Sequence, residues 1–137
     1  MNTEELFHGG LYQHKGSGII HEFWIGKGYA RGFIDVIGGK VSSAKIEEFE
    51  PIMAQPLVLY GLFGVTQEEY DEDDYPRGNW SYNLGKFRLY AHEETWSFFN
   101  GDHRVAYFDN VHELQRIYHA ITGKPLKRNN EKSLENK

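Results

Sequence analysis

Apolar side chains are concentrated in short segments that glycine, proline and polar residues separate. Residues 19–26 and 29–37 are rich in β-branched and aromatic side chains on both faces, which favours well-covered β-strands. Residues 11–18 are expected to form a loop that leads into the first of these strands. The most apolar run covers residues 56–65, and within it Leu57 to Leu62 are predicted as a buried strand.

A glycine pair follows the second of these strands. Gly38 and Gly39 predict a two-residue hairpin turn, because glycine adopts a positive φ without a steric penalty. The chain would then return as a strand over residues 40–50, with Val41 opposite Val36. The weak periodicity of this returning segment leaves a helical turn over its second half as the alternative.

Three strands of a meander are predicted near the C-terminus, over residues 86–92, 95–99 and 103–108. Asn100-Gly101 is the strongest short hairpin signal in the chain. With these two residues as the loop, Phe99 would pair with Asp102, and Trp96 would pair with Val105.

A helix with marked ends follows the meander. Asn110 and Glu113 have the spacing of a capping box, and Gly123 with Pro125 marks the end of the helix. One side of this helix carries the apolar stripe Val111, Leu114, Ile117, Tyr118 and Ile121. The solvent-exposed side is expected to carry His112, Arg116 and His119.

These elements predict an α+β fold. We expect one mostly antiparallel sheet of about six strands, curved into a half-open barrel, with the C-terminal helix packed on one face. Residues 1–126 would form a single domain, and residues 127–137 a polar tail that frays.

Charge and cysteine content narrow the class of function. The net charge is −5, and six of the seven residues from Glu68 to Asp74 are acidic, so that without these six the net charge would be +1. A single acidic segment argues against general nucleic-acid binding, which needs a basic surface.

The chain has no cysteine, which excludes thiolate chemistry and favours a cytosolic location. The first ten residues lack a signal-peptide core, no apolar run is long enough for a membrane span, and no cofactor motif is present.

The acidic segment is the first candidate site. Acidic side chains alternate there with aromatic ones. The acidic side chains would attract a basic protein partner, and the aromatic side chains would be buried against it. A solvated loop and a calcium site are the alternatives, although Pro76 and Tyr82 stand where an EF-hand loop needs glycine and glutamate. The residues expected to bind the partner are Tyr70, Asp71, Asp73, Asp74, Tyr75 and Trp80.

A second hypothesis is a pocket for a small, nucleotide-like ligand. Aromatic side chains make up 15% of the chain and occur on both faces of the predicted strands, so one face is left to line a pocket or to be covered in a homo-oligomer. The polar contacts to such a ligand are expected from His21, Arg31, Arg88 and His103.

A hydrolase is the third hypothesis. It would use His21 or His103 together with a carboxylate from Glu22, Asp35 or Asp102. No serine lies in a nucleophile elbow, and no glycine-rich segment matches a phosphate-binding loop. The sequence therefore favours a binding protein over an enzyme.

Overall fold

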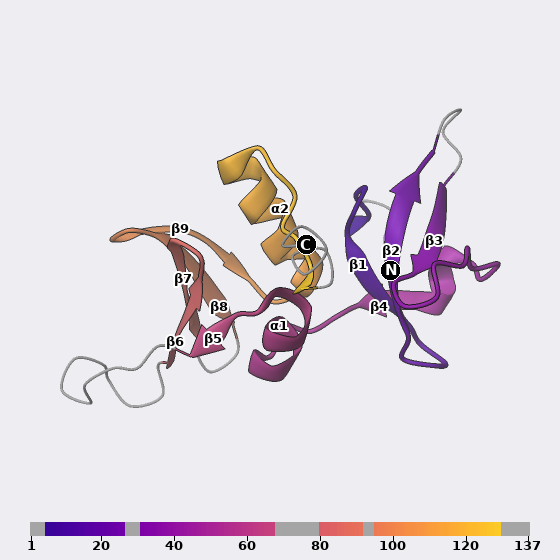
Figure 1. The fold of residues 1–137 in the computed structure, drawn as a ribbon, viewed down its shortest axis with the longest axis horizontal. Helices are drawn as coiled ribbons and strands as arrows, with labels where there is room; N and C mark the ends of the chain where they lie inside the picture. Colours follow the sequence, from indigo (N-terminus) through magenta and orange to yellow (C-terminus); the bar gives the residue numbers. More distant parts are fainter. Residues whose placement is uncertain (1–4, 27–30, 68–79, 92–94, 130–137) are drawn as a thin grey trace, which may run out of the picture. The chain divides into compact units, whose positions relative to one another are not determined.

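The computed structural model describes residues 5–26, 31–67, 80–91 and 95–129, which form an α+β fold with two antiparallel sheets (Figure 1). The chain divides into two compact units. The first unit comprises Met1–Met53 and Asn110–Arg116, and the second comprises Ala54–Asp109 and Ile117–Lys137. The α+β class is confirmed, whereas the single sheet was a wrong prediction. Among the described strands, neither sheet closes into a barrel.

The sheet of the first unit has the strand order β3-β2-β1-β4. Its central strand β1 covers residues for which we had predicted a loop. Tyr12 pairs there with His21 on one side and with Pro51 on the other, and a strand with two partners does not need a strong sequence pattern of its own. The strands are β1 (Leu11–His14), β2 (Ile20–Ile25), β3 (Arg31–Asp35) and β4 (Phe49–Pro51), and the 3-10 helix η3 (Ile46–Glu48) precedes β4.

The turn after β3 is longer than the two-residue turn that Gly38 and Gly39 predicted. Val41 forms a bridge with Ile34, not with Val36. The cause is Asp35, whose Oδ1 accepts the backbone N–H groups of Ile37 at 2.8 Å and of Gly38 at 3.2 Å. These two hydrogen bonds stabilise the charged carboxylate and lower the pKa of Asp35. With these hydrogen bonds, the turn is two residues longer than the predicted two-residue turn.

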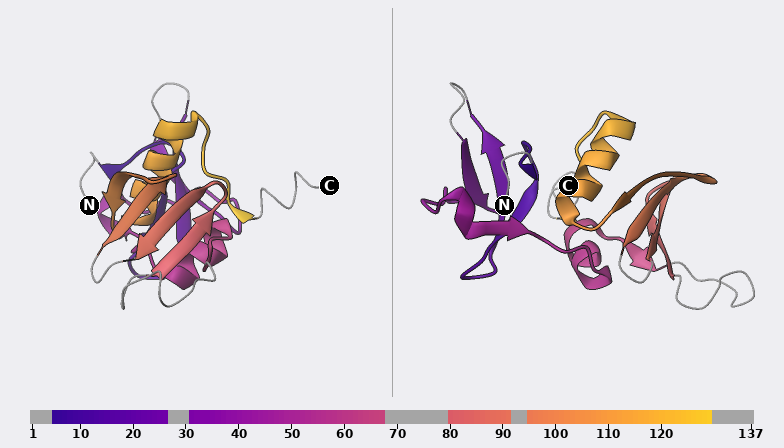
Figure 2. Two further views of the ribbon diagram at one scale, coloured as in Figure 1. Left: turned by 90° about the vertical axis from the view of Figure 1, so that its left-hand side faces the viewer. Right: turned by 180° about the vertical axis from the view of Figure 1, so that it is seen from behind.

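The sheet of the second unit is a continuous meander in the order β5-β6-β7-β8-β9, which Figure 2 shows from two further sides. The three predicted C-terminal strands are confirmed, and β5 and β6 are additional strands outside the predicted ones. The strands are β5 (Thr66–Gln67), β6 (Trp80–Leu84), β7 (Phe87–Ala91), β8 (Trp96–Asn100) and β9 (His103–Phe108).

The predicted register of the β8–β9 hairpin was wrong. Asn100 pairs with His103, so the turn consists of Gly101 and Asp102, and Gly101 has a φ of +64°. A register shift between Phe98 and Phe99 then moves Trp96 opposite Phe108. A bulge of this kind inserts one residue into one strand, and no local sequence signal reports it.

The apolar run after Pro56 is the helix α1 (Pro56–Phe63), not a strand. Proline suits the first helical position, because its fixed φ is helical and its missing N–H needs no partner there. Gly64 ends the helix with a φ of +74°, and its N–H donates to the carbonyl of Tyr60 at 2.9 Å. A short apolar run does not distinguish a buried strand from a buried helix, and these two end signals should have decided the prediction.

The C-terminal helix α2 (Val111–Thr122) begins and ends where the sequence predicted. The carboxylate of Glu113 accepts the backbone N–H of Asn110 at 3.1 Å and its side-chain amide at 3.0 Å. Gly123 has a φ of +73° and donates its N–H to the carbonyl of His119 at 2.9 Å. One prediction for this helix was wrong: His112 is buried, whereas Arg116 and His119 are exposed as expected.

No helix within the described ranges has the length and apolarity to cross a membrane.

Each unit has its own aromatic core. In the first unit, Phe33 and Phe49 stack with their ring centroids 3.8 Å apart. In the second unit, adjacent aromatic residues of one strand point to opposite faces, as predicted: Phe108 is buried and Tyr107 is exposed. The aromatic clusters are therefore sheet cores on one face of the strands.

Two predictions about chain organisation stay predictions. Two compact units can belong to one cooperatively folding domain, so they do not decide whether residues 1–126 form a single domain. The predicted tail lies mainly outside the described residues. Its third residue, Asn129, donates its side-chain amide to the carbonyls of Tyr60 at 3.1 Å and Gly61 at 3.0 Å.

Candidate functional site

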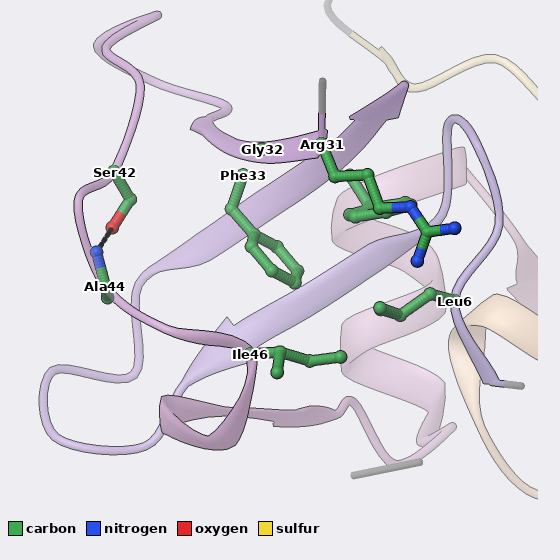
Figure 3. A pocket seen from close by; sticks show the side chains of 8 residues that line it. Leu6, Arg31, Gly32, Phe33, Ser42, Ala44 and Ile46 are labelled. Carbon is green, nitrogen blue, oxygen red and sulfur yellow. Dashed lines mark hydrogen bonds between the residues drawn. The ribbon is translucent and has the colours of Figure 1, made fainter. Parts of the chain in front are cut away.

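A pocket of about 300 Å³ lies in the first unit, beside β2, β3 and the segment that leads to η3. This volume equals that of roughly ten water molecules in the liquid and lies at the lower end of the range for ligand pockets. Figure 3 shows the ring of Phe33 between the two ends of the pocket, with Arg31 and Leu6 at one end and Ser42 and Ala44 at the other. Its lining consists of Leu6, Phe23, Arg31, Gly32, Phe33, Ser42, Ala44 and Ile46.

The aromatic wall of the pocket is held in place by the core of the first unit. Phe23 and Phe33 are opposite residues of β2 and β3, and their ring centroids lie 5.2 Å apart. Phe33 also contacts Tyr12 edge-on, with the centroids 6.1 Å apart. Because Phe33 is packed on several sides, its ring presents a preformed apolar surface to the pocket.

Arg31 supplies the charge at the pocket. Residues 31 and 33 point to the same face of β3, since side chains alternate along a strand. The guanidinium of Arg31 is therefore on the pocket side, at the end of the pocket formed by Leu6, although Arg31 itself is exposed (Figure 3). Within the described ranges, this guanidinium has no ion-pair or hydrogen-bond partner. Arg31 is thus the one predicted ligand contact that lines the pocket.

His21 lies elsewhere in the same unit and does not line the pocket. It is buried, its Nδ1 lies 3.0 Å from the carbonyl oxygen of Ile19, and its ring contacts Phe49 edge-on. Asp35 is directly opposite His21 in the sheet, but Oδ1 of Asp35 accepts N–H groups of the turn. In the described part of the chain, no histidine ring forms a hydrogen bond with a carboxylate.

The other two predicted ligand contacts belong to the second unit. Arg88 lies half-buried in β7, opposite Phe99, and His103 is exposed at the start of β9. Asp102, one of the three carboxylates suggested for a hydrolase, is exposed in the adjacent turn. The four ligand-binding residues that the sequence suggested are therefore divided between the two units.

The predicted partner-binding segment lies almost entirely outside the described residues. Tyr70, Asp71, Asp73, Asp74 and Tyr75 fall between the described ranges, and Trp80 is the first residue of β6, paired with Ala91. The structure thus leaves this hypothesis as the sequence stated it.

Sequence reasoning missed most of the pocket. Phe23 and Phe33 lie within the two strands predicted over residues 19–26 and 29–37, but the sequence reasoning did not place them opposite each other. Leu6, Ala44 and Ile46 come from segments without a strong pattern, and they meet at the pocket only in the folded chain. Among the described residues, no group of three or more His, Asp or Glu side chains could hold a metal ion.

A buried histidine also contacts the core behind the pocket. His112 of α2 is 3% exposed and stacks on Tyr12, with their ring centroids 5.3 Å apart, while its Nδ1 has no hydrogen-bond partner among the described residues. Burial lowers the pKa of His112, against the opposite effect of Glu113 and Glu5, and Arg116 lowers it further. Burial likewise raises the pKa of Tyr12 to about 12, so its hydroxyl stays neutral and donates to the carbonyl of Glu5 at 2.5 Å.

We expect the free energy of unfolding to fall as the pH is lowered through 6.5, the ordinary pKa of histidine. The pKa of His112 is lower in the folded state, so the unfolded state binds more protons in this range and gains relative stability on acidification. His112→Phe keeps an aromatic ring against Tyr12 and removes the titrating group. Urea denaturation between about pH 7.5 and 5 should therefore show a weaker pH dependence for this variant.

His119→Phe is the matched control, because His119 is exposed on the same helix. It should keep the pH dependence of the wild type. Equal pH dependence in the wild type and in His112→Phe would contradict the assignment to His112.

Comparisons of the chain with protein-family models, with curated proteins and with solved structures find no significant match.

Proposed function

We propose that the protein is a binding protein that holds a small, largely apolar ligand in the pocket of the first unit. The observation that carries this proposal is the preformed pocket of about 300 Å³ with a wall of packed aromatic rings. A concave apolar surface with a small number of polar groups is the usual form of a small-molecule site. A ligand that fills it would remove the half-buried side chains of Leu6, Ala44 and Ile46 from water.

Filling the pocket should abolish ligand binding without unfolding the protein. Ala44→Leu adds a larger side chain at the pocket lining, and filling a hollow of this kind is expected to change the free energy of unfolding by less than about 1 kcal/mol. The neutral probe 3-phenylpropionamide should bind the wild type with a millimolar Kd and shift the backbone amide signals of residues 31–33 and 42–46 in NMR spectra. Ala44→Leu should weaken binding at least about tenfold.

Ser43→Leu is the matched control for this experiment. Ser43 is exposed and does not line the pocket, so the same side chain there should leave the affinity unchanged. The proposal fails if neither 3-phenylpropionamide nor its carboxylate analogue causes saturable shifts in the wild type, or if both variants behave alike.

A second proposal concerns the acidic segment and is supported by the sequence alone. Its local charge and its aromatic residues fit recognition of a basic protein partner that the protein would sequester or block. The lack of cysteine supports a cytosolic location, and the aromatic side chains on both faces of the strands support a homo-oligomer.

Charge removal in the acidic segment tests the second proposal. A variant with Asp71, Asp73 and Asp74 changed to Asn should lose a partner that the wild type captures from host extract, and capture by the wild type should weaken at high salt. A variant with the exposed acids Glu47 and Asp102 changed to amides should retain that partner. If the variant of Asp71, Asp73 and Asp74 still captures the partner, the binding surface lies outside the acidic segment.

A further inference from the structure

The polar side chains of the described pocket lining offer hydrogen-bond donors. Arg31 contributes a guanidinium, which has only donors, and none of the eight lining residues that the structure describes is acidic. The Oγ of Ser42 accepts the N–H of Ala44 at 3.1 Å, which occupies a lone pair and leaves its hydroxyl hydrogen to donate. A ligand that satisfies these two side chains brings acceptor atoms.

We infer that the ligand is a small organic monocarboxylate, with its carboxylate on Arg31 and its apolar body against Phe33 and Ile46. This inference rests on the proposed function. The planar guanidinium matches a carboxylate with two parallel hydrogen bonds. Among the described lining residues it is the only charged side chain, so it balances a carboxylate, whereas a phosphate monoester would leave about one negative charge without a counter-charge.

The position of Arg31 supports an anion at one end of the pocket. Arg31 lies on the edge strand β3, opposite Ile25, and its side chain reaches the pocket end formed by Leu6 (Figure 3). An apolar body would enter between the rings and Ile46, while the carboxylate stays at the exposed guanidinium, partly in water. This arrangement spares the ligand the cost of a fully buried charge.

A matched pair of probes tests the charge preference. The wild type should bind 3-phenylpropionate about five- to tenfold more tightly than 3-phenylpropionamide, which has the same shape without the charge, and NMR titration measures both. In Arg31→Gln the preference should disappear, with the affinity for the amide nearly unchanged. Lys40→Gln, which removes an exposed cation of the same unit outside the pocket lining, should keep the preference.

The outcomes separate this inference from the proposed function. If both probes bind equally and Ala44→Leu blocks both, the pocket binds ligands but the carboxylate inference is wrong. If the preference survives in Arg31→Gln, Arg31 does not receive the carboxylate, and the inference is also wrong. If neither probe binds, the proposed function and the inference fail together. A preference that Arg31→Gln abolishes and that weakens from low to high salt supports the inference.

Discussion

Replacement of Phe49 by alanine is expected to lower the free energy of unfolding by about 3–5 kcal/mol. The side chain is 0% exposed, and its ring stacks on Phe33 at a centroid distance of 3.8 Å. The rings of His14 and His21 contact it edge-on at 5.5 and 5.1 Å. Removal of a ring from such a cluster loses its transfer free energy and leaves a cavity that packed neighbours fill only in part.

Urea denaturation measures this effect, and two variants calibrate it. Phe49→Leu should lose less stability, because most of the apolar volume remains. Val41→Ala, at a position that is 72% exposed in the same unit, should change the free energy of unfolding by less than about 0.5 kcal/mol. A loss below about 1 kcal/mol for Phe49→Ala would contradict the close packing of this core.

The number of unfolding transitions in the same experiment tests the single-domain prediction. Phe98 is the corresponding fully buried ring of the second unit. For a single cooperative domain, Phe49→Ala and Phe98→Ala should each shift one common transition that fluorescence and circular dichroism report alike. Two transitions, of which each variant shifts a different one, would contradict a single domain.

Replacement of Gln115 by alanine is expected to cost about 2–4 kcal/mol of the free energy of unfolding. The side chain is buried in the first unit, where its Oε1 accepts the backbone N–H of Leu11 at 2.9 Å. Its Nε2 donates to the carbonyl of Gly9 at 3.0 Å. Truncation leaves these two backbone groups without their partner, and an unsatisfied buried polar group costs about 1–3 kcal/mol.

Gln115→Met separates the hydrogen bonds from the packing. Methionine has nearly the same length and fills the space, but it satisfies neither backbone group, so its cost should approach that of alanine. Hydrogen exchange of the Leu11 amide should accelerate in both variants. If Gln115→Met is as stable as the wild type, the two hydrogen bonds contribute little and the predicted mechanism is wrong.

Local signals in the sequence were sufficient for several elements. Asn110, Glu113 and Gly123 marked the ends of α2, because capping depends on neighbours within one helical turn. The meander of β7, β8 and β9 followed from alternating side chains and a glycine turn. Its exact register did not, because a bulge and a turn displaced by one residue depend on how the completed sheet packs.

The candidate site could be predicted only in part. Arg31 and the aromatic character of a pocket were expected, and Arg31 and Phe33 share a face by simple alternation along one strand. His21, Arg88 and His103 were expected beside Arg31, but none of the three lines the pocket. Chemical type suggests a ligand contact, whereas position in space decides it, and position depends on which strands become neighbours.

The sequence by itself determined the α+β class, the antiparallel hairpins, the C-terminal helix and the alternation that gives the aromatic strands a buried and an exposed face. These features arise from residues a few positions apart, where backbone geometry dictates the outcome. Tertiary structure alone decided the burial of His112, the strand β1 and the walls of the pocket. Their causes are long-range contacts, such as the hydrogen bond between Leu11 and Gln115 across 104 residues, which no local pattern encodes.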